Sequence, residues 1–326
     1  MHTSLRNKTI VITGASSGVG RAAAEAFAQE GAKLVLAARG KEALAETVET
    51  CERLGAKAIA VQTDVSKIEE VDKLVQKAID FGGSIDVWVN NAGVLAFGKF
   101  DEIPADVTDQ IIKTNLLGYV HSAHSVLPVF KEQRSGILIN NISIGGWMPA
   151  PYGTAYTASK YGVRGLVEGL QAEVSEYPDI HICALYPGFQ KSAGIQHAGN
   201  YSGIKLSTPP PAFDPRRLAM SMVKVAKYPV QSTYPDAASY IFKKMYDFFP
   251  GLVRATSAYA MRLAMKFANK APVSEGNVLE ASKGPMKVHG RVLVRHPEKV
   301  ARYTAIAALG IAALIILSRS TQKEKR

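Results

Sequence analysis

Residues 8–30, KTIVITGASSGVGRAAAEAFAQE, join a short β-branched run to a glycine-rich loop and an alanine-rich stretch. The run ending at Thr13 predicts a buried strand, and the stretch up to Glu30 predicts a helix. Glycines at such a junction let the backbone turn tightly and let a pyrophosphate approach the N–H groups at the helix start. Glycine triplets are common in loops, but a strand and a helix flank this one, so it predicts nucleotide binding. The predicted contacts are Gly14, Ser16, Ser17, Gly18, Val19 and Gly20.

The end of the next predicted strand, 33–38 (KLVLAA), bears on which dinucleotide would bind. In folds that prefer NAD, an acidic residue at this point holds the ribose 2′-hydroxyl. This chain has Ala38 there and Arg39 immediately after it. A guanidinium suits a 2′-phosphate, so the sequence favours NADP(H). The alternative is a surface arginine at a helix start.

Polar and small residues also follow the next two predicted strands, 58–62 and 85–89. Asp64 could accept the adenine amino group while Val65 packs on the ring, or Asp64 could simply cap the helix that starts near Ser66. After the second strand, small and amide residues would let a cofactor lie against the backbone. These are Asn90, Asn91, Ala92 and Gly93.

Asn115 lies within KTNLLGYVHSAH, in a long predicted helix. Asparagine is mildly unfavourable inside a helix, because its side chain competes for backbone hydrogen bonds. Its position therefore indicates either a functional role or a buried amide whose hydrogen bonds are satisfied.

Tyr156 and Lys160 lie one helical turn apart in PYGTAYTASKYGVR, residues 151–164. Side chains at i and i+4 share one face of a helix. A unit charge about 4 Å away, at an effective dielectric near ~20, is worth about 4 kcal/mol. That energy could lower the tyrosine pKa of ~10 by up to about 3 units. Such a tyrosine is a usable general acid or base at neutral pH.

By itself Tyr-x-x-x-Lys is a weak pattern, since it occurs again at Tyr201 and Tyr240, and an isolated match is usually a solvated pair on a helix face. The first pair differs in its context. Ser143 precedes Tyr156 by thirteen residues and closes the apolar run 136–143, so we expect it at the carboxyl end of a strand. The other two pairs have glycine and lysine at that offset. Only the first pair therefore has a hydroxyl partner that could polarise a substrate oxygen.

A further apolar run, 180–186 (IHICALY), ends at Pro187 and Gly188. Strands and helices alternate along the chain up to this point, which predicts an α/β fold with a doubly wound, mostly parallel, Rossmann-like sheet. Ligands of such sheets bind outside the carboxyl ends of the strands. The residues expected to meet at that edge are Gly14, Arg39, Asp64, Asn91, Ser143 and Pro187.

These motifs resemble those of the short-chain dehydrogenase/reductase family. The matches run in the family's order over about residues 5–195. They are TGASSGVG at 13–20, NNAG at 90–93, Asn115, Ser143, YTASK at 156–160 and PG at 187–188. The chain looks closest to the NADP(H)-preferring branch, through Arg39.

The resemblance implies a catalytic role for four residues. Tyr156 would donate a proton to a carbonyl or accept one from an alcohol. Lys160 would lower the tyrosine pKa and hold the nicotinamide ribose. Ser143 would hydrogen-bond the substrate oxygen, and Asn115 would position a water in the proton relay. No metal is implied by this mechanism.

The resemblance also implies cofactor contacts near the later strands. Asn91 and its neighbours would line the cofactor, and Pro187 and Gly188 would border the nicotinamide. Ser192 stands where the family usually has a threonine against the carboxamide, so the hydroxyl is kept and the methyl group is lost.

Composition bounds the class of protein. The chain has 326 residues, 47% hydrophobic and 21% charged, which is typical of a globular protein with a sizeable core. Cys51 and Cys183 match no metal spacing and are expected to be reduced core residues. A strand is predicted almost at once, so no signal peptide is expected. The formal net charge is +11, and much of the positive excess falls after residue 240. The sequence contains no nucleic-acid-binding motif. The positive charge is therefore interpreted as a membrane-binding surface or as a plain solvated surface.

We expect one catalytic domain over 1–270, with a substrate lid over about 190–270, and a polar linker over 271–302. Residues 303–318, YTAIAALGIAALIILS, carry no charge and precede a basic tail, 319–326. Sixteen residues at ~1.5 Å each span about 24 Å, short of the ~30 Å hydrocarbon core, and flanking arginines can snorkel across the difference. The run is expected to anchor the C-terminus in a membrane and leave the catalytic domain in the cytoplasm. The alternative is a helix docked on another subunit.

The sequence thus predicts an NADP(H)-dependent oxidoreductase that interconverts a carbonyl and an alcohol on a hydrophobic small molecule. One alternative is a catalytically silent NADP(H)-sensing protein at a membrane, and another is a membrane-surface scaffold. Relatives often form dimers and tetramers, so a homo-oligomer is expected by analogy alone.

Overall fold

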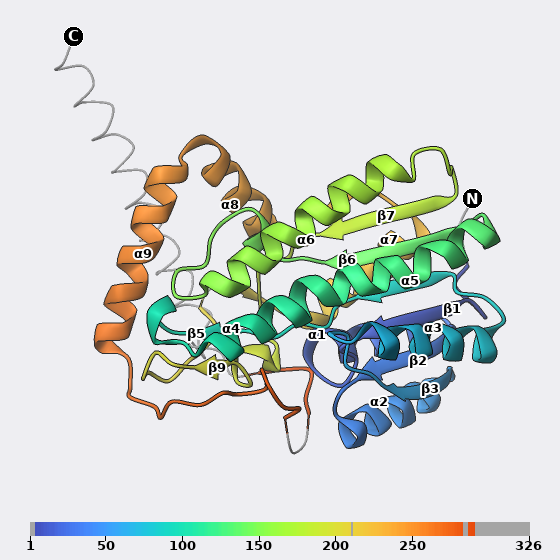
Figure 1. Ribbon diagram of the computed structural model, residues 1–326, viewed down its shortest axis with the longest axis horizontal. Helices are drawn as coiled ribbons and strands as arrows, with labels where there is room; N and C mark the ends of the chain where they lie inside the picture. The colour runs from blue at the N-terminus through green and yellow to red at the C-terminus, as the bar shows by residue number, and fades with distance from the viewer. Residues whose placement is uncertain (1–3, 210, 283–285, 291–326) are drawn as a thin grey trace, which may run out of the picture.

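A seven-stranded parallel sheet forms the centre of the computed structural model, which describes residues 4–209, 211–282 and 286–290 (Figure 1). Its strand order is β11-β7-β6-β4-β1-β2-β3. The strands are β1 (Thr9–Thr13), β2 (Lys33–Ala38), β3 (Lys57–Gln62), β4 (Val87–Asn90), β6 (Gly136–Asn141), β7 (Ile180–Leu185) and β11 (Ser232–Thr233). The order reverses between β1 and β4, so the ligand crevice of this sheet is expected beyond their carboxyl ends. The predicted doubly wound parallel sheet is confirmed.

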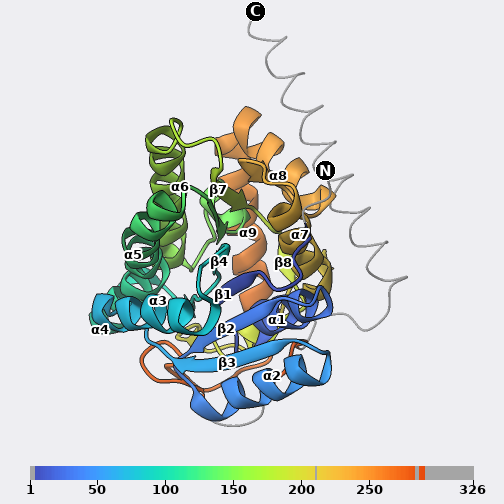
Figure 2. The same cartoon turned by 90° about the vertical axis from the view of Figure 1, so that its right-hand side faces the viewer.

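Helices cover both faces of the sheet (Figure 2). The helices α1 (Gly18–Gln29), α2 (Lys41–Arg53) and α7 (Pro215–Lys227) pack on one face, and α3 (Ile68–Gly82), α5 (Gly118–Gln133) and α6 (Thr154–Glu173) pack on the other. Along β1 the side chains alternate between the two cores: Ile10 and Ile12 join the first, and Val11 joins the second. A strand that is buried on both faces is apolar along its whole length, so the apolar run up to Thr13 predicts a strand correctly.

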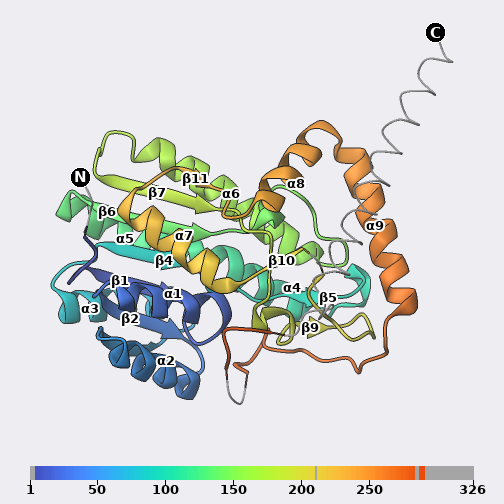
Figure 3. The ribbon, with the colours of Figure 1, turned by 180° about the vertical axis from the view of Figure 1, so that it is seen from behind.

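The region expected to be a substrate lid, about 190–270, is only partly an appendage. Within it α7 lies against α1 and buries Leu218 and Met222, so this helix belongs to the core (Figure 3). The short pairs β8 (Phe189–Gln190) with β10 (Ala212–Phe213), and β5 (Ala96–Phe97) with β9 (Gly199–Asn200), lie beyond the main sheet. The elements at the end of the molecule toward which the strands point are α4 (Ala105–Ile112), α8 (Ala237–Phe248) and α9 (Pro250–Phe267).

The predicted polar linker after residue 270 is held against the rest of the domain at several described positions, although residues 272–276 are exposed. The backbones of Asn200 and Ser274 exchange two hydrogen bonds, and Val278 is fully buried. Met286 and Val288 are also buried, so three apolar side chains hold a segment whose composition is otherwise polar. We call residues 277–282 and 286–290 the strap. The rest of the predicted linker, the predicted anchor at 303–318 and the basic tail at 319–326 lie outside the described residues. Among the described ranges, no helix is long and apolar enough to cross a bilayer.

Candidate active site

Ser143 and Tyr156 come together beyond the end of β6, as the sequence predicts. Ser143 lies two residues past the strand and has a φ of 107°, a conformation that a non-glycine residue adopts only under constraint. Its hydroxyl accepts a hydrogen bond from the Gly145 N–H at 3.1 Å and shares one with the phenol of Tyr156. Tyr156 is half-buried in the first turn of α6. A hydroxyl and a phenol thus converge where a substrate oxygen could contact both.

Lys160 lies one turn further along α6 and is only 4% exposed. Its ammonium donates to the carbonyl oxygen of Asn141 at 3.3 Å and lies 5.0 Å from the ring centre of Tyr119. Burial lowers the pKa of Lys160 to about 7. An amine with this pKa is partly deprotonated at neutral pH, whereas an exposed lysine is almost fully protonated.

The predicted depression of the Tyr156 pKa by Lys160 is not found. Burial raises the pKa of Tyr156, and the hydrogen bond from Ser143 opposes that rise only in part. The ammonium of Lys160 lies 5.7 Å from the centre of the Tyr156 ring and is directed at the Asn141 carbonyl. Spacing along a helix places the two side chains on one face, but it does not determine where the end of a lysine points.

Asn115 is a buried amide whose hydrogen bonds are satisfied. It accepts from the Val94 N–H at 2.7 Å and donates to the Val94 carbonyl at 2.9 Å and to the Ser159 hydroxyl at 3.2 Å. It lies in a π-helical turn, Lys113–Leu117, between α4 and α5. Such turns occur frequently at functional sites. Asn115 thus fixes the chain after β4 against α6, next to Lys160, and its water-positioning role stays a prediction.

The glycine loop is closed by Asn91, from the end of β4. The Asn91 amide donates to the carbonyls of Thr13 and Gly14 at 3.1 and 3.3 Å, and its oxygen accepts from Asn141. Gly14 has a φ of +67°, and a Cβ at Gly20 would lie 2.1 Å from the Gly14 carbonyl oxygen. Both glycines are therefore required for the backbone path that brings the start of α1 close to β1. Ser16, Ser17 and Val19 lie in the same loop and first turn.

Two of the predicted cofactor contacts have their donors engaged by the strap. Arg39 donates to the carbonyls of Val278 and Leu279 at 3.1 and 3.2 Å, to that of Asn277 and, more weakly, to that of Glu280. Burial lowers the pKa of Arg39, and the nearby Asp64 carboxylate opposes this. The backbone N–H of Gly18, the first residue of α1, donates to the Lys287 carbonyl at 3.0 Å.

A third predicted contact, Ser192, also touches the strap. Its backbone pairs with that of His289 in an antiparallel bridge. The three contacts come from the glycine loop, the end of β2 and the segment after β7. The strap therefore spans the predicted nucleotide site from side to side.

Other predicted residues are committed to local structure. The side chain of Asn90 is buried between the Trp88 indole and the Asn140 amide, within the sheet. One carboxylate oxygen of Asp64 accepts from both the backbone N–H and the hydroxyl of Ser66, which closes a turn ahead of α3. The predicted helix cap is wrong, because α3 begins at Ile68 with Lys67 as its N-cap and no side chain caps it. Val65 lies against Gly118, where a Cβ would come within 2.7 Å of it. An adenine contact from Asp64 and Val65 stays a prediction.

Asp236 is a site residue that the sequence analysis missed. One oxygen of its carboxylate accepts from the Gly188 N–H at 2.9 Å, and the other caps α8 by accepting from the Ser239 N–H at 2.7 Å. The carbonyl of Pro187 in turn accepts from the Ile144 N–H. Asp236 thus fixes the predicted nicotinamide border to the start of α8. The Asp-x-x-Ser pattern at 236–239 is a helix-start signal, but nothing local indicates its long-range partner.

Among the described residues, no cluster of three or more histidine, cysteine, aspartate or glutamate side chains could hold a metal ion. Ala92 and Gly93 follow β4 at the crevice, and a Cβ at Gly93 would come within 3.3 Å of the Asn115 amide oxygen. The small residues there leave the backbone accessible, as a close-lying cofactor would require.

The sequence matches known proteins over most of the sheet. Residues 8–200 match the family model described as short chain dehydrogenase. An uncharacterized oxidoreductase of Listeria monocytogenes is 40% identical over 184 residues, which is 56% of this chain and 74% of the relative. An uncharacterized oxidoreductase of Staphylococcus aureus is 34% identical over 227 residues, 70% of this chain and 94% of the relative.

Solved structures share the fold. An alcohol dehydrogenase from Thermococcus sibiricus, complexed with 5-hydroxy-NADP, superposes with a TM-score of 0.60 at 29% identity, over 70% of this chain and 95% of that one. A short-chain dehydrogenase/reductase from Burkholderia phymatum, in complex with NAD, gives 0.68 at 25% identity, over 83% and 99%. The two neighbours therefore carry different dinucleotides.

Proposed function

Because the chain belongs to the short-chain dehydrogenase family, it is an oxidoreductase by descent, and we propose that it uses NADP(H) to interconvert a carbonyl and an alcohol. The observation that carries the proposal is the convergence of Ser143, Tyr156 and Lys160 beyond the end of β6, on the same edge as the glycine loop. Gly14 and Gly20 allow the tight backbone path that brings the start of α1 close to β1, and such a loop at a helix N-terminus suits a pyrophosphate.

The chain's own residues orient the substrate and move its proton. The Ser143 hydroxyl holds the substrate oxygen, and the Tyr156 phenol, which shares a hydrogen bond with it, gives that oxygen its proton. Lys160 has a pKa of about 7, so it can pass a proton toward the tyrosine and take one back near neutral pH. The bound nicotinamide supplies or accepts the hydride.

The choice of NADP(H) over NAD(H) rests on the end of β2. Ala38 stands where an acidic residue would favour NAD, and the guanidinium of Arg39 follows it. Arginine suits a 2′-phosphate because its planar donors match the phosphate oxygens.

A hydrophobic substrate is favoured by the aromatic side chains next to Ser143. Trp147, Tyr186, Tyr234 and Tyr240 form a chain of ring contacts with centroid separations of 5.7, 5.3 and 5.7 Å. This chain reaches from the turn after Ser143 to α8. Tyr186 is buried and Trp147 lies under Arg164 and Lys243, so an apolar substrate body would contact Tyr234 and Tyr240.

The proposal is tested by following the oxidation of NADPH and NADH by the purified full chain, in detergent, against a panel of ketones, aldehydes and lipid-like carbonyls. We expect turnover of apolar carbonyls with NADPH, and at least tenfold lower kcat/KM with NADH, because a charge-assisted contact contributes about 1.5–3 kcal/mol. Turnover with NADH equal to that with NADPH would refute the cofactor assignment. No turnover with either coenzyme on any carbonyl would refute the enzyme itself.

We also propose a membrane as the partner of the C-terminal third, through the uncharged run 303–318 and one face of α9. Tyr259, Leu263 and Phe267 are 62%, 44% and 76% exposed and recur every four residues, so they form one stripe along α9. Arg262 and Lys266 flank the stripe, and α9 contains no acidic residue. An apolar stripe beside basic residues is the pattern of a helix that lies in the surface of an anionic bilayer.

The membrane proposal predicts loss of vesicle binding in two variants of the full chain. Leu263→Ser with Phe267→Ser should lower partitioning onto vesicles containing anionic lipid at least tenfold, since burying each side chain contributes about 1.5–3 kcal/mol. Ala313→Lys with Leu314→Lys should lower it further. The control, Leu54→Ser with Phe100→Ser, removes a leucine and a phenylalanine that are 39% and 57% exposed and distant from α9 in sequence, and it should change nothing. Flotation measures all three, and equal partitioning of α9 variant and control would exclude the α9 face.

A further inference from the structure

The strap contacts the nucleotide site through backbone carbonyls that take the donors a dinucleotide would need. Arg39, expected to bind the 2′-phosphate, donates to the carbonyls of residues 277–280. The Gly18 N–H, at the start of α1, donates to the Lys287 carbonyl at 3.0 Å. Phosphates of the cofactor are expected at both of these donors. In the structure the donors are instead bound by backbone carbonyls of the strap, which carry only partial negative charge.

The strap is anchored on both sides of these contacts. Val278 is fully buried in a small apolar cluster with Val94, Ala96 and Ile103. Gly276, just before the strap, has a φ of +60°, and a Cβ there would lie 2.4 Å from the His197 carbonyl oxygen. Gly290, at the other end, donates to the Lys191 carbonyl at 2.8 Å, and a Cβ there would lie 2.2 Å from the Ser192 carbonyl oxygen. A glycine at each end of the strap therefore allows its backbone to pack directly against a neighbouring backbone.

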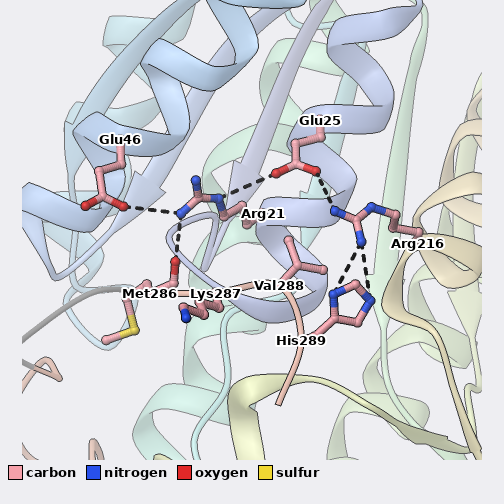
Figure 4. Close-up of a pocket in the computed structure, with 8 residues that line it drawn as sticks. All are labelled: Arg21, Glu25, Glu46, Arg216, Met286, Lys287, Val288 and His289. Atoms are coloured by element: carbon pink, nitrogen blue, oxygen red, sulfur yellow. Dashed lines mark hydrogen bonds and ion pairs between the residues drawn. The ribbon is translucent and has the colours of Figure 1, made fainter.

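A chain of charges holds the second half of the strap against α1 and α7 (Figure 4). Arg21 donates to the Met286 carbonyl at 2.7 Å and pairs with Glu25 at 3.5 Å. Glu25 in turn pairs with Arg216 at 3.6 Å, and Arg216 lies 3.3 Å from the ring of His289. None of these side chains belongs to the predicted catalytic set. Their shared effect is to keep residues 286–289 over the start of α1.

We propose that the strap is an internal competitor for the dinucleotide site, which NADP(H) must displace in order to bind. This inference rests on the proposed function. A phosphate oxygen carries more negative charge than a neutral carbonyl oxygen, so it accepts stronger hydrogen bonds from a guanidinium or a backbone N–H. The cofactor can therefore replace the strap at Arg39 and at the N-terminus of α1. The apparent association constant for NADPH is then the intrinsic association constant multiplied by the fraction of molecules in which the strap is open.

A disulfide across the bridge of Ser192 and His289 tests this directly. The bond from the Gly290 N–H to the Lys191 carbonyl flanks this bridge, so the two residues form a non-hydrogen-bonded antiparallel pair. Such pairs bring Cα atoms to about 4.5 Å, within disulfide range. We expect full-length Ser192→Cys/His289→Cys to bind NADPH at least tenfold more weakly when oxidised than when reduced, as measured by calorimetry. Cys51 and Cys183 are buried and free, so thiol counting reports closure of the new bond.

A variant that opens the strap provides the opposite test and does not depend on disulfide formation. Gly290→Val should tighten NADPH binding at least threefold, which corresponds to a strap closed in about two-thirds of the molecules. The control Gly169→Val adds the same atoms in open space on α6 and should leave affinity unchanged. Affinity that is equal in the two redox states, or weaker NADPH binding by Gly290→Val, would overturn the proposal, and the latter result would mean that the strap closes over bound cofactor. Failure of the proposed function would instead appear as no NADPH binding by any form.

Discussion

Replacing Tyr156 by phenylalanine is expected to lower kcat at least 100-fold while leaving the affinity for NADPH within threefold of the original. The substitution removes one oxygen and keeps the ring, so packing in the first turn of α6 is unchanged. It removes the only described phenol that shares a hydrogen bond with Ser143. Positioned proton transfer contributes about 10²–10⁴-fold to such reactions. Steady-state turnover and calorimetric titration of NADPH separate the two effects.

Tyr201→Phe is the matched control, because Tyr201 begins another Tyr-x-x-x-Lys sequence and its buried hydroxyl has no hydrogen-bond partner among the described residues. Its removal should leave turnover nearly unchanged. The comparison also separates the enzyme from a protein that only senses NADP(H), since a sensor would lose nothing on removal of the Tyr156 hydroxyl. Turnover by Tyr156→Phe within tenfold of the wild type would mean that another group supplies the proton.

Replacing Lys160 by methionine is expected to stabilise the fold and abolish turnover. A shift of the lysine pKa from 10.5 to about 7 corresponds to about 5 kcal/mol of unfavourable burial when the amine is protonated. Methionine fills similar space without that cost, although it loses the bond to the Asn141 carbonyl, so we expect a net gain of at least about 1 kcal/mol at pH 6.5. Urea unfolding measures the gain, and NADPH oxidation measures the loss.

The gain in unfolding free energy of Lys160→Met over the wild type should decrease as the pH rises. The pKa of Lys160 is lower in the folded state, so between about 7 and 10.5 the unfolded chain binds more protons. The unfolding free energy of the wild type therefore rises with pH across that window, and below about 7 the full cost remains. Lys160→Met lacks this contribution, so its advantage should shrink from pH 6.5 to pH 9. Lys224→Met, at an exposed position on α7, should show no such trend. An advantage that is the same at both pH values would contradict the assignment.

The placement of Ser143, Tyr156 and Lys160 beyond the end of β6 was predictable because it depends on local geometry. The apolar run 136–143 predicts a strand and places Ser143 at its carboxyl end, and helical spacing places Tyr156 and Lys160 on one face. Parallel strands end at one edge of the sheet, so alternation of strands and helices was enough to bring the glycine loop there too. These features are set by short-range periodicity and by the few ways in which parallel sheets can be connected.

Only the tertiary structure decided three features. They are the second partner of Asp236, the burial of α7 in the core and the lowered pKa of Lys160. Asp236 reads locally as a helix cap, and its second partner, Gly188, is 48 residues away. Lys160 has the expected neighbours, but its pKa depends on how completely the surrounding elements exclude water, and sequence spacing carries no information about that.

The sequence by itself determined the sheet, the nucleotide loop and the serine–tyrosine–lysine set, because each follows from the pattern of nearby residues. Only the tertiary structure decided that the polar stretch after residue 270 returns to the nucleotide site. Arg39 and Asn277 are 238 residues apart, and the hydrogen bond between them ends on a backbone carbonyl, a group that every residue has. The sequence therefore does not indicate which backbone carbonyls accept the hydrogen bonds of Arg39.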